Sequence, residues 1–267
     1  MKLYIYTTVV LIVLTVVACQ KSIELREDLS LQDPLHSVKL PTDKNILVDA
    51  SKDGGVWWFP QSPITGFSES ADHQGKDLAN YLRSLGFHVD ELPRGAVITD
   101  QLMEKYSRII RVAAFFSYSD DEIEAYKKFL RRPGAILLLQ DHLSYTTNDK
   151  LSELLGLTFR GAVDGTITNF TSHEITAGIG DFPFIAGAVV TNSDNNPNIV
   201  VLGSLDKNNY TILNNSDPFN GPNNTSPPVM GLVNNFPNTR IFFLGDGNGI
   251  EMVPQPLTQN LVNWLFN

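Results

Sequence analysis

Length, composition and charge restrict what this chain can be. Its 267 residues, 42% of them hydrophobic, are enough for one well-packed domain with extensions, because a domain of this size buries most of the surface of the unfolded chain. The formal net charge of −9 argues against a nucleic-acid groove, which needs concentrated positive charge to displace the counterions of the phosphates. We therefore expect no nucleic-acid partner.

Residues 1–19 have the pattern of an export signal. Lys2 precedes an uncharged apolar stretch that ends at Ala18 and is shorter than the roughly 20 residues of a membrane-spanning helix. The segment VVAC resembles the lipobox of bacterial lipoproteins, whose cysteine is lipidated and begins the mature chain. Cys19 is the only cysteine, so it has no intramolecular disulfide partner. We expect a lipid anchor to the membrane of a bacterial cell envelope, at its periplasmic or outer-membrane face; a secreted protein with an ordinary cleaved signal is the alternative.

Residues 20–43 mix charges with prolines and show no sustained periodicity, which is typical of a flexible tether. We expect the folded domain to span residues 44–267. Short apolar runs rich in branched side chains predict its first strands at 45–49, 87–92, 108–114 and 135–140.

Helical patterns separate these strands. An apolar stripe between residues 71 and 85 ends before Gly86, and the segment SDDE at 119–122 has the spacing of a capping box. A third stripe lies at 151–155. Strands that alternate with helices predict the α/β class with a parallel sheet. The second half is less regular, with apparent strands at 198–205, 228–235 and 240–246 and a C-terminal helix at 257–265.

The order of these elements carries a family resemblance. The segments that carry it are SADHQGKDLANYLRSLGFHVD, VITDQLMEKYSRIIRV, SDDEIEAYKKFLRRPGAILLLQDH, SHEITAGI and RIFFLGDGN. From about residue 45 onward the chain resembles class I glutamine amidotransferase-like domains, and is most similar to uncharacterised members found in bacterial lipoproteins. The resemblance implies a flavodoxin-like three-layer sandwich with extra C-terminal strands. Active members place a cysteine nucleophile where this chain has Gln140-Asp141-His142, so the resemblance excludes amidotransfer through a thiolate.

Polar residues follow several of the predicted strands. Asp49, the pair Asp141 and His142, and Asp246 come directly after apolar runs, and His173 lies in a turn, TSHEIT, that similar domains carry. Ligands of open parallel sheets bind beyond the carboxyl ends of the strands, so these residues are candidates for a cleft that binds a divalent cation or a hydroxyl-rich ligand. The alternative is that each aspartate only caps a helix or turn.

Two further features leave alternatives open. Trp57 and Trp58 lie in a long loop, where they could stack on a sugar or fold back over the sheet edge. Arg111 interrupts the third strand, and it either pairs with an aspartate or faces solvent at a sheet edge. The sequence lacks the histidine and carboxylate spacings of dedicated metal sites, so we expect no cofactor; calcium, bound by oxygen-rich loops at 193–198 and 206–210, is the alternative.

These observations favour an envelope-anchored lipoprotein whose altered domain binds a carbohydrate-like ligand or a protein partner. The alternative is an envelope hydrolase that uses strand-end aspartates and histidines. Ser117 and Ser144 lie near strand ends but outside the G-x-S-x-G elbow of serine hydrolases.

The anchor is directly testable. Growth with a fatty-acid analogue should label the wild-type chain and leave a Cys19→Ala variant unlabelled, because lipidation requires the thiol. Two or more acyl chains give stable membrane attachment, so the variant should also leave the membrane fraction. Equal labelling of both chains would contradict the lipobox interpretation.

Overall fold

A single sheet organises the described part of the chain. This computed structural model describes residues 39–52, 75–92, 94–141, 149–213, 226–247 and 255–267, which belong to one unit, Val38–Asn267. Among these residues the sheet has nine strands in the order β2-β1-β3-β4-β9-β8-β7-β5-β6. In the first half of the chain, α-helices alternate with the strands, as expected for an α/β domain.

The first half of the sheet is parallel. Strands β2, β1, β3, β4 and β9 pair in the same direction, so their carboxyl ends share one edge. The elements of this half are β1 (Asn45–Asp49), α2 (Lys76–Ser84), β2 (His88–Leu92), α3 (Asp100–Met103), β3 (Arg108–Arg111), α4 (Asp120–Phe129), β4 (Gly134–Leu139), α5 (Lys150–Leu154), β9 (Thr239–Leu244) and α7 (Gln255–Phe266).

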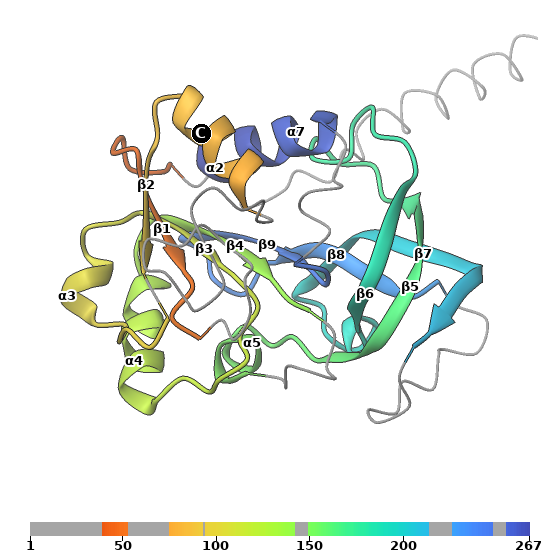
Figure 1. Cartoon of the computed structure of the whole chain (residues 1–267), viewed down its shortest axis with the longest axis horizontal. Coiled ribbons are helices and arrows are strands. Elements are labelled where there is room, and N and C mark those ends of the chain that lie inside the picture. The colour runs from red at the N-terminus through yellow and green to blue at the C-terminus, as the bar shows by residue number, and fades with distance from the viewer. Residues whose placement is uncertain (1–38, 53–74, 93, 142–148, 214–225, 248–254) are drawn as a thin grey trace, which may run out of the picture. The chain divides into compact units, whose positions relative to one another are not determined.

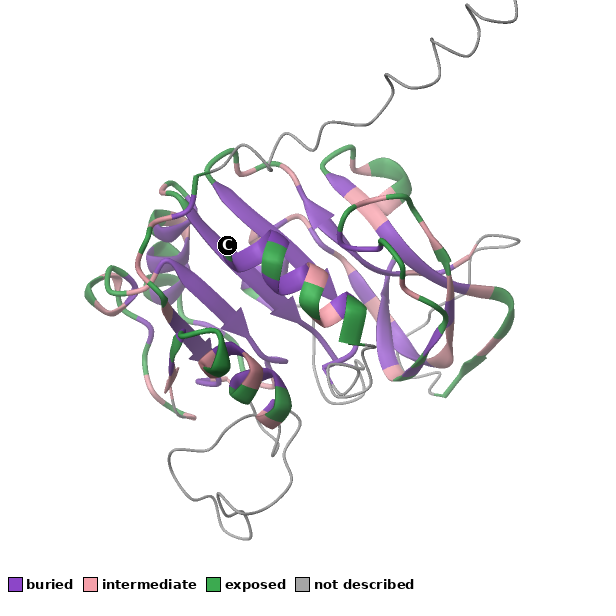
Figure 2. Cartoon of the chain, turned by 90° about the horizontal axis from the view of Figure 1, so that it is seen from above, coloured by how far each residue is buried: buried purple, intermediate pink, exposed green. Residues whose placement is uncertain are grey.

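Helices cover both faces of the parallel strands. Figure 1 shows α2 and α7 on one face and α3, α4 and α5 on the other. Strands β3, β4 and β9 are accordingly buried along their whole length and β1 is buried from Ile46 on, as Figure 2 shows, which explains why these strands appear in the sequence as mainly apolar runs. On the face of α4 and α5, alternate strand residues such as Leu47, Ile109 and Leu138 pack with Phe129 and Leu151.

Local signals of the sequence place the helices. Ser119 and Glu122 form the expected capping box at the start of α4. Gly86 and Gly156 follow α2 and α5 with φ of 83° and 76°, a left-handed conformation in which glycine avoids the clash of a Cβ. The four strands expected in the first half are confirmed; β1 has the expected bounds, and the ends of the other three shift by at most three residues.

The second half is antiparallel and only partly matches the expected strands. Its elements are β5 (Phe159–Phe170), β6 (Phe182–Val190), the 3-10 helix η1 (Ser193–Asn195), β7 (Ile199–Ile212) and β8 (Pro228–Val233). Strands β5 and β6 were not expected from the sequence, because polar, glycine and proline residues interrupt the alternation that marks a strand. They stand at the far end of the sheet, beyond the expected C-terminal strands.

Strand β6 also contacts the end of β9, four places away in the strand order. The N–H of Ala188 donates to the carbonyl of Gly245 at 2.8 Å, and the N–H of Gly245 donates to the carbonyl of Val229 at 2.8 Å. A Cβ on Gly245 would lie 2.0 Å from the carbonyl oxygen of Ala188, so only glycine allows this approach. The antiparallel strands therefore fold back onto the carboxyl end of β9.

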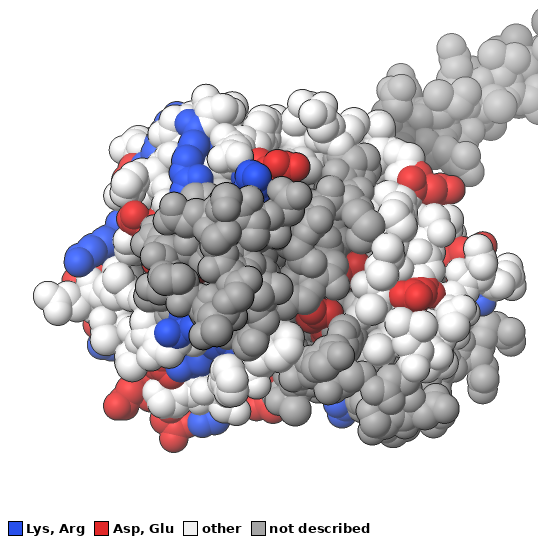
Figure 3. Space-filling model, in the orientation of Figure 1, with Lys and Arg blue, Asp and Glu red and all other residues white. Residues whose placement is uncertain are grey.

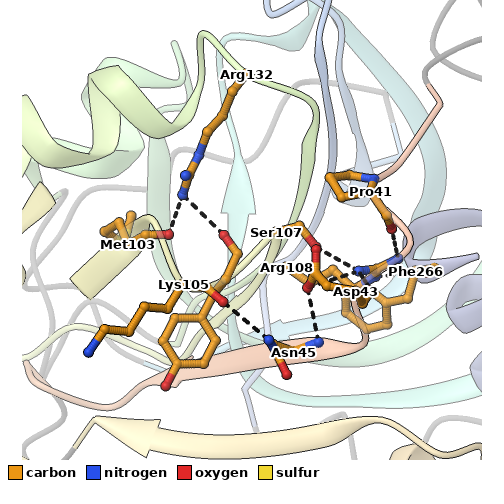
Figure 4. A network of polar contacts seen from close by, with 10 residues as sticks. Pro41, Asp43, Asn45, Met103, Lys105, Ser107, Arg108, Arg132 and Phe266 are labelled. Atoms are coloured by element: carbon orange, nitrogen blue, oxygen red, sulfur yellow. Dashed lines mark hydrogen bonds and ion pairs between the residues drawn. The ribbon is translucent and has the colours of Figure 1, made fainter. Parts of the chain in front are cut away.

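A buried arginine, Arg108, lies at the amino end of the parallel strands. Arg108 donates to the carbonyls of Pro41, Asp43 and Phe266 at 3.0, 2.5 and 2.8 Å, as Figure 4 shows. It thereby joins β3 to the last helix and to the segment before β1. Leu40 of that segment is buried as well. The packed domain therefore includes residues 39–43, which the sequence analysis assigned to the tether, because their carbonyls satisfy a buried guanidinium.

We predict that the segment before β1 stabilises the domain. A chain that begins at Lys44 loses the Arg108 acceptors of Pro41 and Asp43 and should lose about 2–4 kcal/mol, since hydrogen bonds to buried charged groups contribute more than neutral ones. At this size the midpoint of thermal unfolding should fall by roughly 5–15 °C. Circular dichroism melts would test this against a chain that begins at Val38, and equal midpoints would contradict it.

Candidate functional site

Buried polar side chains are concentrated at the carboxyl edge of the parallel strands. This edge holds all three aspartates expected there from the sequence, Asp49, Asp141 and Asp246. Each lies at or just after the end of a strand, and the three strands run in the same direction. The buried polar residues at this edge and at the start of α5 are Asp49, Ser51, Arg111, Gln140, Asp141, Asp149, Ser152 and Asp246. Burial of such groups is costly unless they are paired, so their partners decide what the edge can do chemically.

Asp49, at the end of β1, is held by four donors. Its Oδ1 accepts hydrogen bonds from the backbone N–H and the hydroxyl of Ser51 at 3.0 and 2.6 Å. Its Oδ2 accepts from the hydroxyls of Tyr118 and Tyr126 at 2.7 and 2.5 Å. These donors occupy the acceptor sites of the carboxylate, which leaves Asp49 poorly suited to serve as a general base or a metal ligand.

The two tyrosines form a fixed pair of donors. Tyr118 lies in the loop after β3 and Tyr126 on α4, with ring centroids 5.6 Å apart in an edge-on arrangement. Burial, reinforced by the negative charge of Asp49, raises the pKa of both phenols well above the ordinary value of 10.0. Both hydroxyls therefore stay protonated and keep donating to the carboxylate.

Arg111 forms a buried ion pair at the carboxyl end of β3. The register aligns it with Asp49 of β1, so both side chains lie on the face covered by α4 and α5. Its Nη1 lies 3.1 Å from Oδ2 of Asp149. Asp149 also caps α5, since its carboxylate accepts from the N–H groups of Leu151 and Ser152 at 2.9 Å. Of the two possibilities for Arg111, the aspartate partner is confirmed and the solvent-facing position is wrong.

Gln140 extends this cluster from the end of β4. Its Oε1 accepts from Nη1 of Arg111 at 3.4 Å, while Nη2 of Arg111 lies 3.4 Å from the hydroxyl of Ser152. Within the described ranges, Nε of Arg111 and Nε2 of Gln140 have no hydrogen-bond partner. The edge therefore contains buried donors that lack an acceptor.

A second ion pair ties the loops beside this cluster. Lys52 Nζ lies 2.8 Å from Oε1 of Glu122, which also accepts from the N–H of Ile98 at 3.2 Å. Burial opposes ionisation of Glu122, but the bonds from Lys52 and from backbone N–H groups outweigh it and lower the pKa of Glu122. The sequence indicated Glu122 as a capping residue. The pairing with Lys52 was not foreseeable, because only the fold brings these distant residues together.

Asp141 and Asp246 follow the neighbouring strands β4 and β9. Oδ2 of Asp246 accepts from the N–H of Ile185 at 2.9 Å, and the next N–H, of Ala186, donates to Oδ1 of Asp164 at 2.6 Å. Ala186 has a φ of 55°, which lets two successive N–H groups reach two carboxylates. Alternation along the chain directs Asp141 to the face opposite Gln140. The expected aspartates therefore share an edge, but Asp49 and Asp141 lie on different faces.

His173 packs against the C-terminal helix α7. Its ring packs against Trp264 of α7 with centroids 5.9 Å apart, and the guanidinium of Arg240 lies 5.8 Å from the same Trp264 ring. Arg240 is near the amino end of β9, whereas Asp246 follows its carboxyl end, roughly 20 Å along the strand direction. The expectation that His142 or His173 lies beside the aspartates stays a prediction. Trp57, Trp58, His142 and Cys19 are outside the described residues.

The described residues contain neither a cluster of metal-binding side chains nor a membrane-spanning helix. Among the described residues, no group of three or more His, Cys, Asp or Glu side chains is arranged to hold a metal ion. No helix in the described ranges is long and apolar enough to cross a membrane.

Comparisons with solved structures identify the fold. The mmIFT52 N-terminal domain matches with a TM-score of 0.59 and 16% identity, over 82% of this chain and 94% of that one. A ThuA-like protein from Bacteroides uniformis matches with a TM-score of 0.52 and 17% identity, over 85% and 92% of the two chains. A cytoplasmic protein from Salmonella typhimurium gives 0.52 and 14%, over 82% and 97%.

These similarities concern the fold alone, because the identities are low. ThuA-like proteins have a glutamine amidotransferase-like fold, which agrees in part with the family resemblance of the sequence. No protein-family model matches the chain, and no curated protein does. The chain is thus a mixed α/β protein whose large sheet is mostly parallel in its core.

We predict an alkaline loss of stability that depends on the tyrosine pair. The folded-state pKa of each phenol lies above its unfolded value, so its contribution is complete below about pH 10 and is lost as the pH rises above it. A Tyr126→Phe variant should reduce this pH slope by roughly 1 kcal/mol per pH unit. Urea unfolding between pH 8 and 11.5 would show it. At pH 8, where the phenols are protonated in both states, the difference in free energy of unfolding between variant and wild type measures the lost hydrogen bond. Identical pH slopes in variant and wild type would contradict the prediction.

We also predict strong coupling between Arg111 and Asp149. Arg111→Met should cost about 3–5 kcal/mol, because it leaves the Asp149 carboxylate buried without its cation. Adding Asp149→Asn should recover part of this loss, since asparagine keeps the helix cap and removes the charge. A double-mutant cycle by urea unfolding would measure the coupling, and additive effects of the two changes would disprove it.

Proposed function

We propose that the chain is a lipoprotein of the bacterial cell envelope, anchored through Cys19, whose domain binds a carbohydrate-like ligand or an envelope protein. The binding region is the carboxyl edge of the parallel strands, where ligands of open α/β sheets are held. The fold assignment within this proposal is a flavodoxin-like, glutamine amidotransferase-like three-layer sandwich with added antiparallel strands. The alternative of an ordinary secreted protein would keep the same binding region.

The observation that carries the proposal is the engagement of the strand-end carboxylates. Asp49 accepts four hydrogen bonds, and Asp149 combines an ion pair with a helix cap. A glycoside hydrolase needs one carboxylic acid and one carboxylate directed at the scissile bond. Because Asp49 and Asp149 already accept hydrogen bonds from groups of the protein, they are not available for such catalysis, which favours binding over hydrolysis at this edge.

The surface charge supports a ligand without strong negative charge. In the view of Figure 3, Lys and Arg side chains of the described residues lie mainly over the parallel half, interspersed with Asp and Glu. The antiparallel half shows chiefly Asp and Glu in that view. Together with the net charge of −9, this distribution disfavours polyanions and suits neutral sugars or a protein surface.

Thermal unfolding of the full-length chain in detergent micelles would test binding. We expect at least one neutral oligosaccharide to raise the melting temperature, because a ligand that binds only the folded state stabilises it. At a hundredfold excess over its Kd the gain is about 2.7 kcal/mol, or roughly 5–10 °C at this size. Asp141→Asn should reduce the shift, and Asp194→Asn, the same change at an exposed site, should preserve it.

The same samples separate binding from hydrolysis. Binding predicts that the oligosaccharide remains intact over a long incubation, as shown by an assay for new reducing ends. Turnover that is abolished by Asp141→Asn would instead support the hydrolase alternative. The absence of a thermal shift with any sugar, cation or envelope protein tested would contradict the binding proposal.

A further inference from the structure

Two buried donors at the carboxyl edge lack acceptors among the described residues. Arg111 and Gln140 are both 0% exposed, and among the described residues neither Nε of Arg111 nor Nε2 of Gln140 has a hydrogen-bond partner. Together they present three N–H groups. A buried donor without an acceptor costs about 1–3 kcal/mol, so their joint occurrence needs an explanation.

The orientation of the Gln140 amide does not remove the problem. Its Oε1 accepts from Nη1 of Arg111, and exchange of the two amide atoms would direct N–H groups at a guanidinium, which has no acceptor. Arg111 is in turn held by Asp149 at 3.1 Å. The ion pair therefore fixes the amide so that its NH₂ group is directed away from Arg111's Nη1.

The surrounding charges indicate which acceptor fits. Arg111 contributes one positive charge to the cluster, while Asp49 and Asp149 each contribute a negative one. The cation is thus already matched by Asp149, and Asp49 lies on the neighbouring strand in register with Arg111. A further anion would be repelled and would also lose its hydration in a buried position. A neutral oxygen meets neither cost.

Resting on the proposed binding function, we propose that Arg111 Nε and Gln140 Nε2 form a subsite for a neutral oxygen of the ligand, a hydroxyl or carbonyl of an uncharged sugar. Both donors come from β3 and β4, central strands of the parallel half, at the edge where such sheets bind ligands. The loop after β3 also presents Phe116, which is 63% exposed and supplies an apolar surface of the kind found in ligand sites.

The experiment changes the donors and preserves their shape. In Gln140→Glu the side chain keeps an acceptor for Arg111 and loses both N–H groups; Gln140→Met removes them without adding charge. Gln101→Glu is the matched control, because Gln101 is exposed on α3. Binding to each full-length chain in detergent is measured by thermal shift and titration calorimetry. The probes are glucose, galactose and N-acetylglucosamine, with glucuronate and galacturonate as their anionic counterparts.

We expect a neutral sugar to bind the wild type and Gln101→Glu equally. Its affinity for Gln140→Glu and Gln140→Met should fall at least tenfold, and the uronates should bind the wild type more weakly than the neutral sugars. The melting temperatures of the variants without ligand show whether each variant folds, and so separate a loss of binding from a loss of structure. If Gln140→Glu does not fold, the affinity of Gln140→Met decides whether the donors bind the sugar.

Three outcomes would overturn the subsite. Unchanged affinity in both Gln140 variants would remove the donors from recognition while leaving the proposed binding function intact. Tighter binding of the uronates than of the neutral sugars would overturn a subsite for a neutral oxygen, because the two donors would then prefer an anionic acceptor. If no neutral sugar binds the wild type, a buried water is the better account of the donors, and a ligand of another class found in the same screen would still preserve the binding function.

Discussion

The carboxylate of Asp49 is the interaction on which the carboxyl edge of this protein depends. It is buried at the end of β1 and accepts from Ser51, from Tyr118 after β3 and from Tyr126 on α4. A buried charge with fewer donors would be too costly to keep, so strand, loop and helix must stay in register around it. One buried carboxylate thus holds together β1, the loop after β3 and α4.

The polar groups of this edge are of two kinds: those that are paired within the protein, and donors that the described residues leave without an acceptor. Asp49 and Asp149 are committed to internal donors, and Lys52 and Glu122 are committed to each other. Arg111 and Gln140 differ, because each retains a buried donor that the described residues do not satisfy. Because Asp49 and Asp149 are engaged by internal donors while Arg111 and Gln140 keep donors for recognition, we favour binding over hydrolysis.

The parallel half could be predicted from the sequence, and the antiparallel half only in part. Strands β1, β3 and β4 are buried and mainly apolar because helices cover both of their faces. Strands β5 and β6 lack this signal, since Gly165, Pro183 and Gly187 interrupt them and β6 is an edge strand. Their place was decided by long-range pairing, including the contact of Ala188 with Gly245 at the end of β9.

The sequence by itself determined the α/β class, the capping box of α4 and the position of Asp49, Asp141 and Asp246 after strands, because each depends on residues that are close in the chain. Only the tertiary structure decided the rest. It paired Arg111 with Asp149, placed Asp49 and Asp141 on opposite faces and put His173 against Trp264. These outcomes depend on strand register and on packing between distant segments, which local patterns of residues do not encode.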